Sequence, residues 1–312
     1  MMAEFYYAVA LKSVIFTRHD RLGIIMTQLK QEIDQILGDI ERLPSFPDIV
    51  HKVLQMVRNE DADFQEIAKE ISKDVGLTSD ILRISNSAYY HPSREIRSVH
   101  EAIVILGLKV VKDIVMVSAA RGILKQPITG YRIEERDMWD HSLAVASLSA
   151  KIATDLKTKT PADVAFTAGL LHDVGKVILS QTFRKAYIQI SMDFKKNPNQ
   201  HFTELEKKYM GYNHSEVGGI LLKKWNFPSD LVEAALYNYT PEKATINPEL
   251  TNIVHVANWI VLSAGIGVDA GDLSETLNSD SVSSLGLNDA IMRSLYEDLP
   301  ELMESLKELR DV

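Results

Sequence analysis

Two ionisable side chains, His172 and Asp173, lie next to each other in the apolar run GLLHDVGKVIL, residues 169–179. Burying such groups costs free energy unless a partner or a bound ion compensates them. Imidazole and carboxylate together are ligands that suit Fe, Mn, Zn or Ni. The pair therefore indicates either a metal site or two buried groups that satisfy each other and nearby backbone by hydrogen bonding.

Other candidates for this chemistry lie elsewhere in the chain. His141 stands in WDHS and His214 in NHSEVGG, both within helical patterns. Lys176 follows His172 by four residues and would share its side of a continuous helix. The alternatives for Lys176 are a surface position or an ion pair with Asp173, and Gly175 would bend a helix here.

Composition limits the remaining chemistry. The 312-residue chain has a formal net charge of −9, which argues against a nucleic-acid partner. It contains no cysteine, so disulfides, thiolate metal ligands and cysteine nucleophiles are excluded. We find no apolar run of about 18 residues that would span a membrane, and no secretory signal. The expected compartment is therefore the cytoplasm, without membrane contact.

Helical periodicity dominates the sequence and predicts an all-α fold. Residues 27–43 carry one apolar stripe at three- and four-residue steps. Helix starts are indicated by capping-box patterns at Asp63 with Glu66, Ser98 with Glu101, and Thr203 with Glu206. The polar segment QPITGYRIEERD, residues 126–137, separates two helical lobes.

The predicted organisation has four parts. Residues 1–26 are an N-terminal extension, since Met26 is a second plausible start. Residues 27–130 form the first lobe, 131–275 the second, and 276–312 a helical tail. In the tail, Leu302, Leu306 and Leu309 form a stripe that either packs on its own domain or docks a partner.

Six segments occur in an order that is typical of one family: LPSFPDIVHKVLQMV, DVGLTSDILRISNSAYY, SVHEAIVILGLKVVKDIVMVSA, WDHSLAVASLSAKIA, GLLHDVGKVIL and NHSEVGGILLKKWNFP. Over residues 36–245 the sequence resembles the HDOD domain, a regulatory branch of the HD phosphohydrolase superfamily. The resemblance implies a two-lobed helical HDOD fold with an HD-like second lobe.

The resemblance also implies a ligand set. His141 matches the superfamily's first histidine, His172 and Asp173 match its His-Asp pair, and His214 matches a histidine added in two-metal members. The distal aspartate position holds Asn258, and His255, one turn earlier, is a candidate replacement. In catalytic relatives the lysine that matches Lys176 approaches a phosphate.

Two departures weaken the catalytic interpretation. Where the catalytic cyclic-dinucleotide branch has two adjacent histidines, this chain has Asn238 and Tyr239, and the following Gly-Tyr-Pro loop is missing. A metal enzyme needs held ligands and an open coordination position. We therefore expect either a degenerate site with one divalent metal (Fe, Mn, Zn or Ni) or a metal-free core.

The predicted function is that of a bacterial signal-transduction HDOD protein, non-catalytic or with this degenerate site. It would act through regulatory protein partners or by sensing a small ligand. The alternative is a metal-dependent phosphohydrolase acting on a nucleotide or cyclic dinucleotide, with Lys176 in its catalytic site. The sequence gives no oligomeric state.

Overall fold

The computed structural model describes residues 46–57, 63–87, 90, 92, 94–125, 135–197, 200–267 and 276–307. Every regular element in these ranges is helical, which confirms the all-α prediction. Within the same ranges, no helix is both long and apolar enough to cross a membrane. The apolar stripe predicted for residues 27–43 lies outside the described residues.

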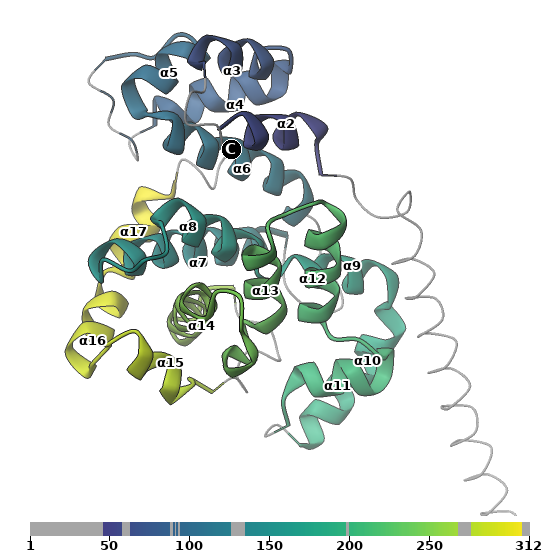
Figure 1. Ribbon diagram of the computed structural model, residues 1–312. Coiled ribbons are helices and arrows are strands. Elements are labelled where there is room, and N and C mark those ends of the chain that lie inside the picture. Colours follow the sequence, from purple (N-terminus) through teal and green to yellow (C-terminus); the bar gives the residue numbers. More distant parts are fainter. Residues whose placement is uncertain are drawn as a thin grey trace, which may run out of the picture.

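The first group of helices lies together at the top of Figure 1. It consists of α2 (Asp48–Val57), α3 (Phe64–Ile71), α4 (Val75–Ser85), α5 (Val99–Leu106) and α6 (Leu108–Leu124). Their amphipathic faces bury Ile67, Ile81 and Ile103 completely or nearly so. Helix α6 also packs on α7, α8 and α9, so it joins this group to the rest of the molecule.

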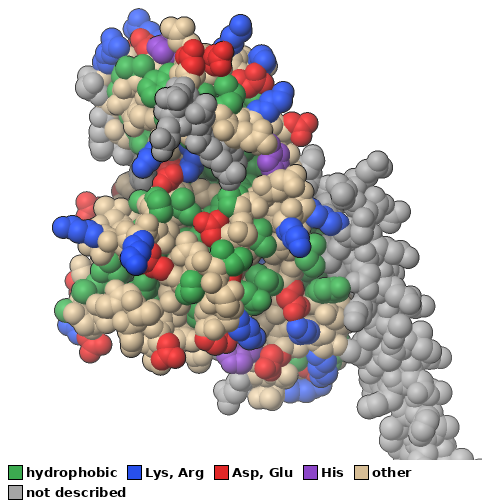
Figure 2. Space-filling view, in the orientation of Figure 1, with side chains coloured by type: hydrophobic (Ala, Val, Ile, Leu, Met, Phe, Trp, Pro, Cys, Tyr) green, Lys and Arg blue, Asp and Glu red, His purple; other side chains and the backbone are tan. Residues whose placement is uncertain are grey.

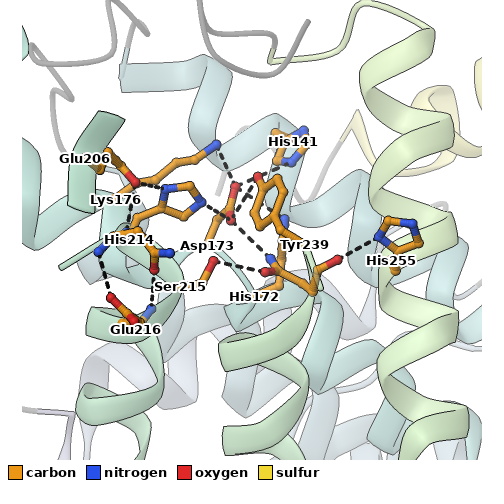
Figure 3. A network of polar contacts seen from close by, with 12 residues as sticks. His141, His172, Asp173, Lys176, Glu206, His214, Ser215, Glu216, Tyr239 and His255 are labelled. Carbon is orange, nitrogen blue, oxygen red and sulfur yellow. Dashed lines mark hydrogen bonds and ion pairs between the residues drawn. The ribbon is translucent and has the colours of Figure 1, made fainter. Parts of the chain in front are cut away.

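The second group includes α14, which Figure 1 shows end-on, and lies below the first group in that view. Its members are α7 (Glu135–Asp155), α8 (Ala162–Leu171), α9 (Val174–Thr182), α10 (Arg184–Lys196), α11 (Phe202–Met210), α12 (His214–Lys224), α13 (Ser229–Tyr237), the 3₁₀ turn η2 (Pro241–Lys243) and α14 (Pro248–Ser263). Helix α14 packs on α7, α8 and α13. This arrangement brings the segments around positions 141, 173, 214 and 238 toward one interior region (Figure 3).

An aromatic cluster links the two groups at a second place. Phe46, which precedes α2, packs edge-on against Phe227 at 5.1 Å between ring centroids, and its ring is tilted by 40° against Trp225 at 5.3 Å. His51 of α2 completes the cluster at 6.1 Å from Phe227. Trp225 directly follows α12, so this helix runs from the interior to the contact with the first group.

The C-terminal helices pack on their own molecule. They are α15 (Ser279–Ser284), α16 (Asp289–Glu297) and α17 (Leu299–Ser305), and they contact α14 and α7. Lys151 of α7 lies 3.2 Å from Asp298, and Leu306 is fully buried. Packing on its own fold therefore accounts for this part of the predicted stripe, while Leu309 lies outside the described residues.

The structure confirms only some of the predicted helix N-caps. Ser98 caps α5 by accepting from the Glu101 amide, as expected, whereas Asp63 accepts from Gln65 instead of from position 66. The box predicted at Thr203 is wrong, because α11 already begins at Phe202 and Glu206 is buried in the interior. The complete capping box lies at Asn213 and Glu216, at the start of α12.

Charged side chains of both signs share the surface. On the face shown in Figure 2, the described lysines and arginines are interspersed with aspartates and glutamates rather than gathered into one basic stripe. Several are paired within the molecule, for example Lys52 with Glu70 and Arg83 with Asp80.

Candidate metal centre

The His-Asp pair lies where one helix ends and the next begins. Helix α8 ends at Leu171 and α9 starts at Val174, so His172 and Asp173 form the turn between them. Both side chains are completely buried. The bend predicted at Gly175 is therefore located at the pair itself, and it turns both side chains toward His141 of α7 (Figure 3).

His141, His172 and Asp173 offer three donor atoms within 4.8 Å of one another. Asp173 Oδ2 lies 3.4 Å from His172 Nε2 and 4.0 Å from His141 Nε2. These separations exceed the N–H···O hydrogen-bond range of about 2.7–3.2 Å. Two ligands of a tetrahedral metal, each bonded at about 2.0–2.2 Å, are about 3.4 Å apart. The donor set therefore fits a shared divalent ion better than direct hydrogen bonding.

Backbone carbonyls orient both imidazoles for such a role. His141 Nδ1 donates to Ile266 O at 3.0 Å, and His172 Nδ1 donates to Gly169 O at 2.7 Å. In each ring this leaves Nε2 toward Asp173. His172 Nε2 is buried and has no hydrogen-bond partner among the described residues. A metal-ligating histidine ordinarily has its other nitrogen held in this way.

Lys176 lies inside the site and not at the surface. Its Nζ is 2.8 Å from Asp173 Oδ2, and the residue is only 1% exposed. Burial alone would raise the pKa of Asp173, but the interactions of its carboxylate with His172 and Lys176 lower this pKa well below its usual range. The aspartate is thus held as a carboxylate, and the lysine supplies a built-in cation at the oxygen that faces the histidines.

The other carboxylate oxygen, Asp173 Oδ1, faces three different groups. His214 Nε2 lies 3.7 Å from it, Asn238 Nδ2 lies 3.4 Å away, and Tyr239 Oη lies 3.5 Å away. Asn238 and Tyr239, which the motif resemblance aligns with two histidines of the catalytic branch, thus both lie beside Asp173 Oδ1. His214 reaches Asp173 but is not part of the three-residue cluster.

Sequence analysis missed one functional candidate, Glu206 of α11. This buried carboxylate accepts from His214 Nδ1 at 2.7 Å and from Tyr187 Oη at 2.9 Å. Burial lowers the pKa of His214, but the carboxylates of Glu206 and Asp173 outweigh it and raise that pKa. The sequence carries no signal that separates Glu206 from a capping glutamate, because Glu206 follows Thr203 by three residues and only the start of α11 at Phe202 excludes the cap.

The structure does not bring His255 into the cluster. Its Nδ1 donates to Asn238 O at 2.7 Å, and its Nε2 accepts from the Asn278 amide at 3.0 Å. Burial lowers the pKa of His255, in keeping with a neutral ring. Asn258, one turn further along α14, is buried, and its Oδ1 has no hydrogen-bond partner among the described residues.

Two glycines let the helices that carry the site approach closely. A Cβ on Gly169 would lie 2.8 Å from Ala146 Cα on α7, and one on Gly175 would lie 2.0 Å from His214 O on α12. Real Cβ atoms essentially never come so near to backbone. The glycines of GLLHDVGK therefore set the distances between α7, α8, α9 and α12.

A polar cavity of about 610 Å³ lies beside the cluster. Its lining comes from α11, the start of α12, the end of α13 and η2, and includes Lys207, Lys243, Tyr237 and Tyr239. Tyr239 is common to this cavity and to Asp173, to which its hydroxyl lies close. The cavity size is within the usual range for small-molecule sites.

The HDOD domain model matches residues 43–241. The chain belongs to the HDOD domain family. Among solved structures, it is similar to an HDOD domain protein with unknown function from Geobacter sulfurreducens. That match has 25% identity and a TM-score of 0.69, and covers 93% of this chain and 97% of the other.

Two further HDOD-like comparisons have lower identity and support the fold. A "Putative phosphohydrolase" from Shewanella amazonensis SB2B has 24% identity and a TM-score of 0.66, covering 88% of this chain and 97% of that one. A "Putative signal transduction protein" from Marinobacter aquaeolei VT8 has 19% identity and a TM-score of 0.71, covering 94% and 65%.

One curated relative is an uncharacterized protein of Treponema pallidum (strain Nichols), 21% identical over 239 residues. The alignment covers 76% of this HDOD chain but only 45% of the Treponema protein. The chain thus spans less than half the length of that relative.

Proposed function

We propose that this HDOD protein is a signal-transduction module whose HD site holds one divalent transition metal and does not turn over substrate at enzyme rates. His141, His172 and Asp173 would hold the ion, which is Fe, Mn, Zn or Ni by the chemistry of the ligands. An ion on these three residues would fasten α7 to the turn between α8 and α9. Its role would be to stabilise one arrangement of the helices.

The surroundings of Asp173 carry the non-catalytic part of the proposal. Its two oxygens face six protein groups: His141, His172, Lys176, His214, Asn238 and Tyr239. All of them except Tyr239 are buried. Metal-assisted hydrolysis needs an open coordination position for water and access for the phosphate. Side chains of the protein itself surround the carboxylate on both sides, which favours a closed site.

A metal-dependent phosphohydrolase is the second candidate, and the His-His-Asp cluster favours it. In that case the ion would lower the pKa of a bound water. Lys176, whose Nζ is 2.8 Å from Asp173 Oδ2, would then have to contact a phosphate as well. The cavity beside Tyr239 is the natural entry for a nucleotide or cyclic dinucleotide.

Metal content is the first measurement. Tag-free protein purified without chelator is analysed by plasma mass spectrometry, beside the double variant His172→Ala, Asp173→Ala. His255→Gln is the matched control, since this buried histidine lies outside the cluster. We expect near one equivalent of metal in the wild type and control, and none in the double variant.

Hydrolysis is then assayed with Mn, Fe and Ni on bis(p-nitrophenyl) phosphate and on cyclic dinucleotides. The proposal expects release of p-nitrophenol, and opening of the cyclic dinucleotide to its linear form, no faster than the blank. Turnover at enzyme rates that disappears in His172→Ala would establish the hydrolase instead. If the wild type and both variants contain no metal, the interpretation of the site as a metal-free core of hydrogen-bonded groups would stand instead.

We also propose that a small ligand binds in the cavity beside Tyr239, and that this binding changes how the protein interacts with its protein partners. Tyr239 supports this because it lines the cavity and also contacts Asp173. The ring of Tyr239 packs edge-on against His214 at 5.0 Å between centroids. A ligand that displaces this ring would therefore change two groups of the HD site.

A further inference from the structure

Three helices contribute one chain of hydrogen bonds behind the HD site. Tyr187 of α10 donates its hydroxyl to Glu206 Oε1 at 2.9 Å. Glu206 of α11 accepts, through Oε2, from His214 Nδ1 at 2.7 Å and from the His214 backbone amide at 3.0 Å. The three residues are at most 3% exposed (Figure 3 labels Glu206 and His214).

The cost of burying Glu206 indicates that its place is specific. An ionised carboxylate in a buried position needs hydrogen-bond donors on its oxygens. Glu206 has donors on both oxygens. One of its oxygens bonds both the ring and the backbone of His214, so the imidazole has little freedom to rotate. Because Nδ1 donates to Glu206, Nε2 is the ring atom that faces Asp173.

We infer that Glu206 is a positioning residue for the HD site. With Tyr187 behind it, Glu206 holds His214 through its Nδ1–H and fixes the orientation of the ring, which then stands against the Oδ1 side of Asp173 with Nε2 at 3.7 Å. The inference rests on the proposed function, because the consequence of a well-placed Asp173 is binding of the ion by Oδ2, His141 and His172.

The two sides of Asp173 explain why this matters. Lys176 lies 2.8 Å from Oδ2, whereas the contacts of Oδ1 with Asn238 and Tyr239 are 3.4 and 3.5 Å long. The rotation of the carboxylate is thus held tightly on one side and loosely on the other. The ring of His214, fixed with its Nε2 3.7 Å from Oδ1, fills the space on this side, so the carboxylate has less room to turn Oδ2 away from the two ligating histidines.

Two readouts on one set of variants test the inference. The variants are Glu206→Gln, which removes the charge, Tyr187→Phe, which removes one hydroxyl, and Glu204→Gln, a control at an exposed position on the same helix. Long-range ¹H–¹⁵N spectra of metal-free protein report which ring nitrogen of His214 carries hydrogen. Titration with Mn²⁺, followed by electron paramagnetic resonance, reports the affinity for the ion.

We expect Glu206→Gln to weaken the Nδ1–H preference of His214 and to lower Mn²⁺ affinity by up to about 10-fold, at the low end of the loss for residues bonded directly to a metal ligand, because Glu206 acts through His214. Tyr187→Phe should act in the same direction with a smaller loss, and Glu204→Gln should behave as wild type. A Glu206→Gln protein with the wild-type tautomer and wild-type affinity would overturn the inference.

The two proposals fail in different ways. If the wild type binds no Mn²⁺, the proposed metal site is wrong. The hydrogen position on the His214 ring is then the readout that tests whether Glu206 orients His214. If Glu206→Gln does not give a cooperative thermal transition, Tyr187→Phe decides both readouts, because it leaves the carboxylate in place. If the Tyr187→Phe variant then matches the wild type in the His214 ring protonation and in Mn²⁺ affinity, the positioning role of Glu206 is rejected.

Discussion

Lys176 Nζ lies 2.8 Å from Asp173 Oδ2, on the same oxygen that faces His141 and His172. The ammonium group of Lys176 therefore lies directly beside a candidate metal ligand and neutralises the negative charge of its carboxylate. A divalent ion on this oxygen would lie close to a like charge. Lysine and metal compete electrostatically for one carboxylate, and this competition gives the first prediction.

Lys176→Met should destabilise the metal-free protein by about 3–5 kcal/mol, because it leaves a buried carboxylate without its cation. The same variant should bind Mn²⁺ at least about tenfold more tightly, so that added metal restores part of the lost stability. Thermal unfolding with and without Mn²⁺ measures both effects. Lys112→Met, which breaks the ion pair with Asp163 between α6 and α8, is the control. An equal response to Mn²⁺ in wild type and Lys176→Met would contradict the competition.

Gly175→Ala should lower the free energy of unfolding by about 1–3 kcal/mol or more, because the new Cβ overlaps backbone. It would lie 2.0 Å from His214 O and 2.6 Å from Gly218 N, so α9 and α12 have to separate. Urea denaturation measures the loss. Gly122→Ala is the matched control on α6: its Cβ meets nothing within 4 Å, and it should stabilise by up to about 1 kcal/mol. Similar values for the two variants would refute the close-packing argument.

Glu233→Gln should cost about 1.5–3 kcal/mol, since hydrogen bonds to a charged group are the stronger ones. Glu233 is buried and accepts from the backbone amides of Thr245, Ile246 and Asn247 at 2.7–2.9 Å. Although burial raises its pKa, these amides lower it below the usual value. A depressed pKa contributes stability above the unfolded-state pKa, and this stability is lost as pH falls through the folded-state pKa.

Urea midpoints taken between pH 7 and pH 3 test this. The difference between wild type and Glu233→Gln should shrink on acidification. Glu242→Gln, at an exposed position in the neighbouring turn, should show no such trend. A constant difference at all pH values would argue against the charged hydrogen bonds.

Asp113 predicts the opposite pH dependence. Burial raises the pKa of this carboxyl from 3.8 to about 8, and its Oδ1 has no hydrogen-bond partner among the described residues. The native state then keeps a proton that the unfolded chain loses, so stability should fall as pH rises from about 4 to about 8. Asp113→Asn should remove this slope and stabilise the protein at pH 8, on the order of 2 kcal/mol. Urea denaturation at pH 5 and pH 8 is the measurement, and an unchanged slope would contradict it.

Part of the fold and of the site follows from the sequence for physical reasons. Helical periodicity gives the all-α class because it reports directly which side chains are buried. The motif order places His141, His172 and Asp173, and the structure brings their donor atoms within 4.8 Å. The same alignment of motifs puts Asn238 and Tyr239 beside Asp173.

Other features need the three-dimensional packing. Glu206 fits a capping pattern equally well, and only the start of α11 at Phe202 shows that it faces inward. His255 has the right spacing on its helix, yet both nitrogens bond elsewhere, one of them to Asn278, which is distant in sequence. The burial of Lys176 depends on the helix break at residues 172 and 173, and periodicity in an apolar run does not locate such a break.

Helix α12 connects the candidate metal site to the aromatic cluster between the two helical groups. It begins at His214 beside Asp173 and is followed by Trp225, which packs on Phe46 of the first helical group. Eleven residues of α-helix span about 16 Å and move as one stiff rod. If His214 moves along the helix axis, Trp225 therefore moves by the same distance. A displacement of the buried histidine would thus change the packing of the aromatic cluster, where the two helical groups contact each other.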